Sequence, residues 1–212
     1  MQGATRPGGE TGARQGDAPV DPPEARVSST GTRPRLSYDV DAAGCIVAVA
    51  GDWDAFARAN DAGALTAADV TGQPLSTYLA DAATRQLYEL LLERVRRDAR
   101  RIVVPIRCDA PDRRREIELE LEPLPAGGVR FHSTVIAETP RSRIPLLDRR
   151  AVRSEDLLRM CCMCHAIATE RGVWLDLEEA VERLPPLRPE PVPPITHGVC
   201  PRCFEIWERD VG

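Results

Sequence analysis

Residues 115–124 read REIELELEPL, and this stretch decides the fold. Ile117, Leu119 and Leu121 alternate within it with four glutamates. A strict alternation of apolar and charged residues is typical of a β-strand with one buried and one solvated face. The stretch therefore predicts a strand of an antiparallel sheet that is covered on one side only.

Four more strands are expected around it, because short β-prone runs are bounded by turn residues on both sides. A hairpin is predicted near the start, with the turn Asp41–Gly44, and Pro105 marks a later strand as an edge strand or a bulged one. The four predicted strands are Leu36–Val40, Cys45–Ala50, Ile102–Cys108 and Val129–Ala137.

Helices are expected between the second and third strands. Asp52 can cap a helix that contains Trp53 and Phe56 and ends near Asn60. A longer helix is predicted from Ala83 to about Arg100, because its apolar residues recur at helical spacing. These apolar residues are Leu87, Tyr88, Leu91, Leu92 and Val95. The order of elements predicts an α+β fold, in which helices flank a five-stranded antiparallel sheet.

Residues 35–138 resemble a PAS sensor domain. The resemblance rests on the opening hairpin with Gly44 in its turn, on Trp53 and Phe56, on residues 69–75, which read DVTGQPL, and on three closing strands. It implies a PAS-like sheet with flanking helices and a pocket between them. It also implies a role in sensing or dimerisation rather than catalysis.

The sequence says less about the contents of such a pocket. Residues 52–100 contain neither histidine nor cysteine, which argues against haem and against a flavin adduct. His132 is expected on the solvent face of the last strand, and Cys45 and Cys108 are expected to be small buried residues. A small-molecule ligand and a pocket filled by its own side chains both stay open.

The composition divides the 212-residue chain into four parts. Residues 1–34 are rich in Gly, Pro, Ser, Thr and Arg and are predicted to be a disordered leader. Residues 35–138 form the sheet domain, 139–153 a linker, and 154–212 a cysteine-rich module. All 28 basic residues are arginine, which we interpret as the codon bias of a GC-rich bacterium.

The expected compartment is the cytoplasm. The sequence contains no apolar run of the roughly 18 residues that a membrane helix needs, and its first residues lack the apolar segment of a signal peptide. Cytosolic thiols stay reduced, so the seven cysteines are not interpreted as a disulfide framework.

The cysteines indicate a metal site. Cys161 and Cys164 form one C-x-x-C step, and Cys200 and Cys203 form a second. Two such steps are typical of a structural zinc site with four thiolate ligands. The intervening residues are predicted to contain a helix at Trp174–Leu184 and a proline-rich stretch. A segment of about sixty residues has too small a core to fold alone, and bound zinc would supply the missing stability.

Several alternatives remain at this site. His165 or His197 could replace one of the thiolate ligands, or could form a hydrogen bond to a ligand without binding the ion itself. Cys162 could compete with Cys161 for the ion. Cys161 to His165 also matches the attachment motif of c-type haem, but that cofactor is attached outside the cytosol. A third hypothesis is that the cysteines form a reversible dithiol switch.

The module also resembles short carboxyl-terminal modules that follow PAS or receiver domains in bacterial signalling proteins. The matching features are Met160–Cys164, Trp174 before a Glu-rich helix, and His197–Cys203, which reads HGVCPRC. No settled activity comes with this resemblance.

Together these features predict a bacterial signalling or regulatory protein. In it, a PAS-like sensing or dimerisation domain is coupled to a zinc-stabilised module that binds a protein partner, and a homodimer is a further expectation. The alternative is a redox-responsive regulator whose cysteines release zinc or form disulfides on oxidation. No catalytic motif was recognised, so an enzyme is not expected. Residues 151–212 carry 7 arginines against 11 acidic residues, which argues against nucleic-acid binding.

Overall fold

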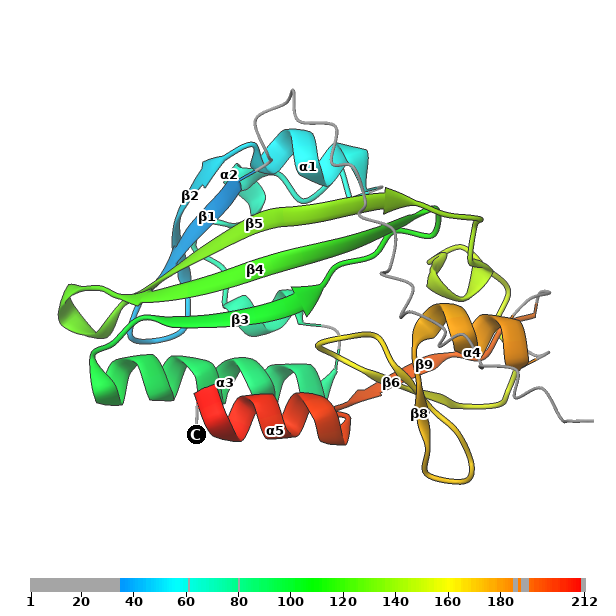
Figure 1. Cartoon of the computed structure of the whole chain (residues 1–212). Helices are drawn as coiled ribbons and strands as arrows, with labels where there is room; N and C mark the ends of the chain where they lie inside the picture. The colour runs from blue at the N-terminus through cyan, green and yellow to red at the C-terminus, as the bar shows by residue number, and fades with distance from the viewer. Residues whose placement is uncertain (1–34, 61, 80, 185–186, 188–190, 211–212) are drawn as a thin grey trace, which may run out of the picture. The chain divides into compact units, whose positions relative to one another are not determined.

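The larger sheet has five strands in the order β2-β1-β5-β4-β3, and all its neighbouring strands are antiparallel (Figure 1). The structure is a computed structural model that describes residues 35–60, 62–79, 81–184, 187 and 191–210. The predicted leader, residues 1–34, lies outside the described residues. The five strands are β1 (Arg35–Val40), β2 (Ile46–Gly51), β3 (Ile102–Arg107), β4 (Arg113–Pro123) and β5 (Val129–Pro140).

The alternation in β4 is confirmed. Ile117, Leu119 and Leu121 are at most 5% exposed, and the glutamates between them lie on the other face of the sheet. A bulge between Glu116 and Ile117 shifts the register against β5. β5 extends beyond the predicted end at Ala137, because its last residues still pair with the start of β4. The α+β class and the five-stranded antiparallel sheet are therefore as predicted.

Glycines allow the hairpin of β1 and β2. Gly44 has a φ of +86° in its turn, a conformation that glycine adopts without strain. At the other end, a Cβ on Gly51 would lie 2.1 Å from the carbonyl oxygen of Arg35. Only glycine therefore fits at position 51 without a shift of β1.

The long helix α3 (Ala82–Asp98) covers the buried face of the sheet (Figure 1). It begins after Asp81, whose carboxylate accepts a hydrogen bond of 3.0 Å from the amide of Thr84. It ends at Ala99, which has a left-handed φ of +47°. The residues that face the sheet are Leu87, Leu91, Leu92 and Val95, all buried.

Aromatic residues occupy the space between α3 and the sheet. Phe131 is fully buried on β5 and stacks on Tyr38 of β1, with ring centroids 4.7 Å apart. Tyr88 of α3 stacks near the same ring at 6.0 Å, and Trp53 meets Tyr38 edge to face. The chain's own side chains thus pack much of the region in which the PAS resemblance implies a pocket.

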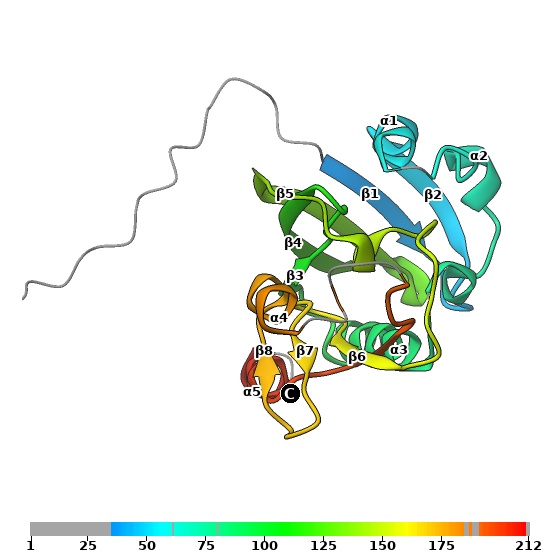
Figure 2. The ribbon, with the colours of Figure 1, turned by 90° about the vertical axis from the view of Figure 1, so that its right-hand side faces the viewer.

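The shorter helices lie near β1 and β2 (Figure 2). They are α1 (Trp53–Ala59), α2 (Ala67–Val70) and the 3-10 turn η1 (Leu75–Tyr78). Asp52 precedes α1 as predicted, but its side chain makes no capping hydrogen bond. Two further 3-10 turns, η2 (Pro125–Gly127) and η3 (Pro145–Leu147), follow β4 and β5. Among the described residues, no helix combines the length and the hydropathy needed to cross a bilayer.

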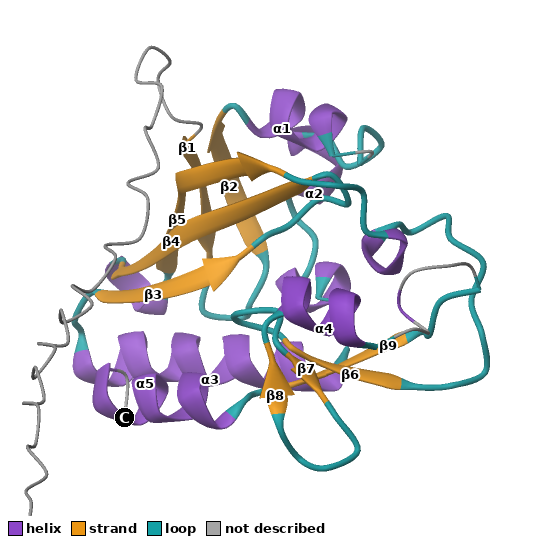
Figure 3. Ribbon diagram, turned by 45° about the vertical axis from the view of Figure 1, so that its right-hand side comes forward, coloured by secondary structure: helices purple, strands orange, loops and turns teal. Residues whose placement is uncertain are grey.

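The cysteine-rich part contains a second, four-stranded sheet in the order β8-β7-β6-β9 (Figure 3). Its elements are β6 (Leu158–Cys161), β7 (Ile167–Ala168), β8 (Trp174–Leu175), α4 (Leu177–Arg183), β9 (Ile195–Gly198) and α5 (Pro201–Asp210). The prediction of a helix from Trp174 was wrong at its start. Trp174 pairs with β7, and Asp176 caps the helix by accepting a hydrogen bond from the amide of Glu178.

The two sheets share buried residues, and the described residues belong to one compact unit. Cys161 and Met163 belong to the same buried cluster as Val104 and Leu119 of the larger sheet. The amide of Arg107, at the end of β3, donates a hydrogen bond of 2.7 Å to the carbonyl of Met163. The turn that carries Cys161 and Cys164 therefore packs against β3, the edge strand of the five-stranded sheet, and is hydrogen-bonded to it.

The intervening residues contribute to a second core. Ile144 and Leu146, from the segment predicted as a linker, are buried together with Met160 and Ile167. Leu177 and Ala180 of α4 belong to the same cluster. The segment after β5 is thus held by apolar packing as well as by its chain connections.

Two expectations about single residues need correction. Cys45 and Cys108 are only half-buried, because they lie just outside β2 and β3 rather than within them. His132 lies on the face opposite Phe131, as expected, but its side chain is only 18% exposed. Its Nε2 atom lies 3.6 Å from the carboxylate of Glu122 on the neighbouring strand.

Candidate metal centre

The first cysteine pair lies on the tight turn between β6 and β7. Cys161 is the last residue of β6, and its amide donates a hydrogen bond of 2.7 Å to the carbonyl of Ala166. The amide of His165 returns a bond of 3.0 Å to the carbonyl of Cys161. His165 has a φ of +61°, which allows the chain to reverse within a few residues. Cys161 and Cys164 therefore lie on the same turn.

The second pair lies at the start of α5. Cys200 directly precedes the helix, and Cys203 lies in its first turn. β9 leads into this helix and runs parallel to β6, with Cys161 opposite Gly198. The amide of Cys162 donates a hydrogen bond of 2.9 Å to the carbonyl of Gly198. Parallel pairing thus brings together two cysteine pairs that are far apart in the sequence.

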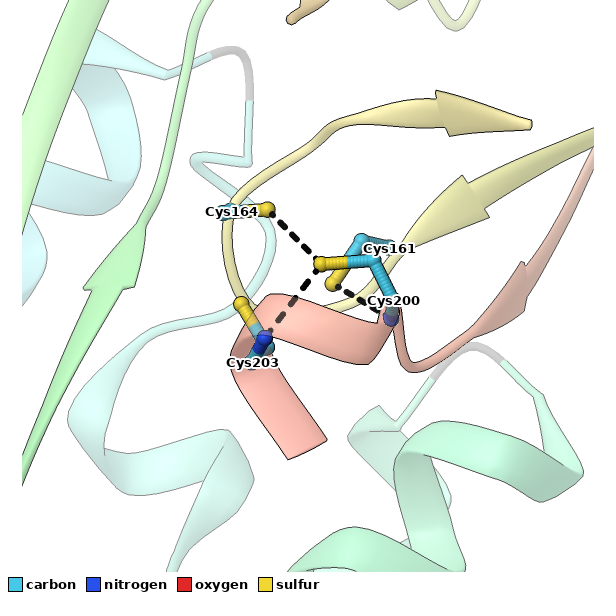
Figure 4. A group of neighbouring side chains, drawn as sticks. All are labelled: Cys161, Cys164, Cys200 and Cys203. Carbon is cyan, nitrogen blue, oxygen red and sulfur yellow. Dashed lines mark hydrogen bonds between the residues drawn. The ribbon is translucent and has the colours of Figure 1, made fainter. Parts of the chain in front are cut away.

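The structure places the four predicted cysteines in one cluster (Figure 4). Their sulfur atoms all lie within 4.8 Å of one another, and Cys164 Sγ lies 3.6 Å from Cys200 Sγ. Four Zn–S bonds of about 2.3 Å in a tetrahedron separate the sulfurs by about 3.8 Å. The amides of Cys200 and Cys203 each point at a sulfur from 3.5 Å, that of Cys161 and that of Cys200. The donor set and its spacing therefore fit a tetrahedral metal ion.

The four sulfurs differ in burial and in proton affinity. Cys161, Cys200 and Cys203 are at most 4% exposed, whereas Cys164 is half-buried. Hydrogen bonds from Cys164 and Cys203 lower the pKa of Cys161, and the same contacts raise the pKa of Cys203 and that of Cys164, the latter to about 12. Without a cation, one negative charge suppresses ionisation of its neighbours. A divalent ion would allow all four to ionise.

The three alternative ligands lie outside the cluster. His165 directs Nδ1 toward the carboxylate of Asp109, at 3.3 Å. His197 pairs through Nδ1 with Asp81, the residue that caps α3. Cys162 is half-buried, and burial together with the nearby Cys161 raises the pKa of its thiol to about 12. Within the described part of the chain, the group of side chains that could hold a metal ion consists of the four predicted cysteines.

A group of charged side chains beside the cluster was missed from the sequence. Arg107 is only 7% exposed and forms ion pairs with Asp109 and with Glu178, the latter at 2.8 Å. Arg141 bonds the same two carboxylates, at 3.1 and 2.6 Å. These contacts join the end of β3, the segment after β5 and the first turn of α4. No local signal reveals them, since the partners of Arg107 are up to 71 residues away.

A pocket of about 550 Å³ borders the cluster. Cys164, Cys200 and Cys203 line it, but Cys161 does not. The rest of the lining combines apolar residues such as Ile106 and Ile206 with charged ones, namely Arg107, Arg114, Glu116, Asp176 and Arg202. One side of the cysteine cluster therefore adjoins accessible space, while Cys161 faces the core.

Comparisons with known proteins give little beyond this geometry. No protein-family model matches the sequence, and no curated protein matches it. Among solved structures, a domain of an HTR-like protein from Haloarcula marismortui ATCC 43049 is similar, at 16% identity and a TM-score of 0.37. The match covers 49% of this chain and 99% of that one. The strand order and the packing described above define the fold of this chain.

Proposed function

We propose that this chain is a non-catalytic signalling or regulatory protein of the bacterial cytoplasm. A PAS-like sensing or dimerisation domain, residues 35–138, is coupled in it to a zinc-stabilised protein-interaction module, residues 154–212. The observation that carries the proposal is the assembly of four cysteine sulfurs within 4.8 Å from two separate loops. Sulfur ligands in a tetrahedral arrangement suit zinc better than the hard cations magnesium or calcium.

Zinc accounts for the stability of the small sheet. Its strands are two to four residues long, shorter than strands usually are in a sheet that is stable by itself. A metal ion bound by both cysteine pairs would fix the turn after β6 to the start of α5. Structural zinc typically contributes about 10–16 kcal/mol of binding free energy, which is ample for this purpose.

The contacts between the two sheets support coupling. Met163 lies between the two cysteines of the first pair, is 1% exposed, and accepts the hydrogen bond from the amide of Arg107. The Arg107 side chain reaches Glu178 at the start of α4. A change in the position of β3 would therefore act directly on the cysteine turn and on α4.

The site geometry also supports a non-catalytic role. Cys164 and His165 are the nearest candidates for a nucleophile and its base. The Cys164 sulfur lies beside Cys200, whereas His165 is directed at Asp109. The side chains are thus engaged with different partners, and the geometry of an activated thiol is not formed.

The test is partner capture by the full-length protein in its native host, with chemical crosslinking before purification. Wild type is compared with the double variant Cys200→Ser/Cys203→Ser and with Cys45→Ser, which changes a cysteine outside the cluster. We expect wild type and Cys45→Ser to recover the same partner, and the double variant to lose both zinc and partner.

A partner set that is independent of zinc would contradict the proposed role of the module. Recovery of the chain's own copies alone would identify the interaction as homodimerisation. Light scattering on the purified protein would then show a dimer whose stability depends on the cysteine pairs.

A further inference from the structure

We infer that the cysteine cluster is a modification site: small hydroperoxides oxidise Cys164, which then forms a disulfide with Cys200. This inference rests on the proposed function, because it takes the four cysteines as a metal-binding group. The predicted bond joins one cysteine of each C-x-x-C step. It does not join the two members of a step, which are the closest in sequence.

Access selects Cys164 as the first sulfur to react. It is the only half-buried member of the cluster, and it lines the 550 Å³ pocket. Cys161 is fully buried and does not line the pocket. Because thiol oxidation depends on exposure as well as on thiolate character, the reagent reaches Cys164 before Cys161.

A direct contact between the two sulfur atoms indicates Cys200 as the second sulfur. Its Sγ lies 3.6 Å from that of Cys164 and also borders the pocket. A disulfide needs a separation of about 2.0 Å, which small rotations of the two side chains can supply. The Cys161 sulfur is held on the other side by the amide of Cys200. The contact between Cys164 and Cys200 therefore lies beside the pocket, which Cys203 also lines.

A positive group is available where negative charge develops. Arg202, an exposed residue that lies between the two cysteines of the second step in the sequence, lines the pocket. The oxygen that leaves during each oxidation step carries negative charge. A guanidinium in this pocket can stabilise that charge by hydrogen bonding.

The chemistry consists of two balanced steps. The Cys164 thiolate attacks one oxygen of hydrogen peroxide: an S–O bond forms, the O–O bond breaks, and hydroxide leaves. The sulfur loses two electrons, which reduce the peroxide. The Cys200 thiolate then attacks the Cys164 sulfenic acid, so that an S–S bond forms, the S–O bond breaks and a second hydroxide leaves. The cluster has then lost two of its four thiolates and with them its affinity for zinc.

The test is a peroxide titration of full-length, zinc-loaded protein, with zinc release followed by a colorimetric chelator. Free thiols are blocked at each point, and the protein is digested with trypsin. Arginines at 159, 171, 183 and 202 place the first cysteine step in peptide 160–171, Cys200 in peptide 184–202, and Cys203 in a separate peptide that begins at that residue. We expect a cross-link between peptides 160–171 and 184–202, located at Cys164, that appears together with released zinc.

Two variants of α5 test the role of the pocket. Ile206 lines the pocket, so Ile206→Ala widens it and should accelerate zinc release several-fold. Phe204 is 52% exposed on the same helix and does not line the pocket, so Phe204→Ala should leave the rate unchanged. If Ile206→Ala does not fold, the smaller change Ile206→Val serves the same purpose.

The outcomes separate this inference from the proposed function. A first disulfide within one step, either Cys161–Cys164 or Cys200–Cys203, would overturn the inference while the zinc site stands. Zinc and thiols that resist peroxide until the protein unfolds would do the same. Protein that holds no zinc before peroxide is added would contradict the proposed function itself, and with it the basis of this inference.

Discussion

Replacing Arg107 by methionine tests the ionic contact between the five-stranded sheet and α4. Arg107 is 7% exposed, and its guanidinium contacts Asp109 and Glu178. The Asp109 side chain has no exposed surface. Methionine keeps the apolar stem but removes the charge, so Asp109 retains Arg141, at 3.1 Å, as its remaining arginine partner.

The size of the effect follows from this burial. Removing one partner of a buried ion pair costs about 3–5 kcal/mol, because the other charge stays buried. Since Arg141 compensates for part of the loss, we expect the free energy of unfolding to fall by about 3 kcal/mol. For a chain of this size, that corresponds to a decrease in Tm of about 6–12 °C.

Urea denaturation followed by circular dichroism measures the effect. The matched control is Arg101→Met, whose side chain is 60% exposed and pairs with Glu120 at 3.1 Å, so its effect should stay below about 0.5 kcal/mol. The double variant Arg107→Met/Asp109→Asn should regain part of the loss, because the fully buried carboxylate of Asp109 is then replaced by a neutral amide. A loss below about 1 kcal/mol in Arg107→Met would refute the reasoning.

Three further predictions concern the sheet domain and its link to β9. Phe131→Ala should lower the free energy of unfolding by about 3–5 kcal/mol in urea, because Phe131 is fully buried, whereas Phe204→Ala should change it by less than about 0.5 kcal/mol. The hydrogen-bonded Arg130 lowers the pKa of Asp39, so this pair stabilises the fold above the ordinary aspartate pKa and ceases to do so as pH falls through the lowered value. Carboxyl-carbon NMR should accordingly show a higher Asp39 midpoint in Arg130→Gln, and an unchanged midpoint would contradict the assignment. Asp81→Ala removes the cap of α3 and should destabilise the protein by about 1 kcal/mol or more in thermal unfolding; no change in Tm would show that the cap is dispensable.

Sequence patterns predicted the elements that are determined by residues close together in the sequence. The alternation in residues 115–124 identified β4 because each side chain there faces either the core or solvent. The C-x-x-C steps identified the cluster because one short turn brings both of its cysteines to the same place. The pairing of the two steps was inferred from ligand chemistry, and the structure supplies the parallel contact between β6 and β9 that brings it about.

Features that depend on contacts between residues far apart in the sequence were not predicted. Trp174 and Leu177 are spaced like residues of one helix, but pairing with β7 keeps Trp174 in a strand. Arg107 follows Ile106 at the end of an edge strand, where a charged residue normally faces solvent. Its burial depends on Glu178 and on the cysteine turn, which lie more than fifty residues later in the chain. The sequence of β3 alone therefore does not indicate that Arg107 is buried.

The four clustered cysteines are proposed to hold one zinc ion. X-ray absorption at the zinc edge, on protein purified without an affinity metal, tests it most directly. We expect one zinc ion for each chain, with four sulfur neighbours at about 2.3 Å. A nitrogen neighbour would show that His165 or His197 is a ligand in place of a cysteine. The absence of zinc from the natively purified protein would contradict the account.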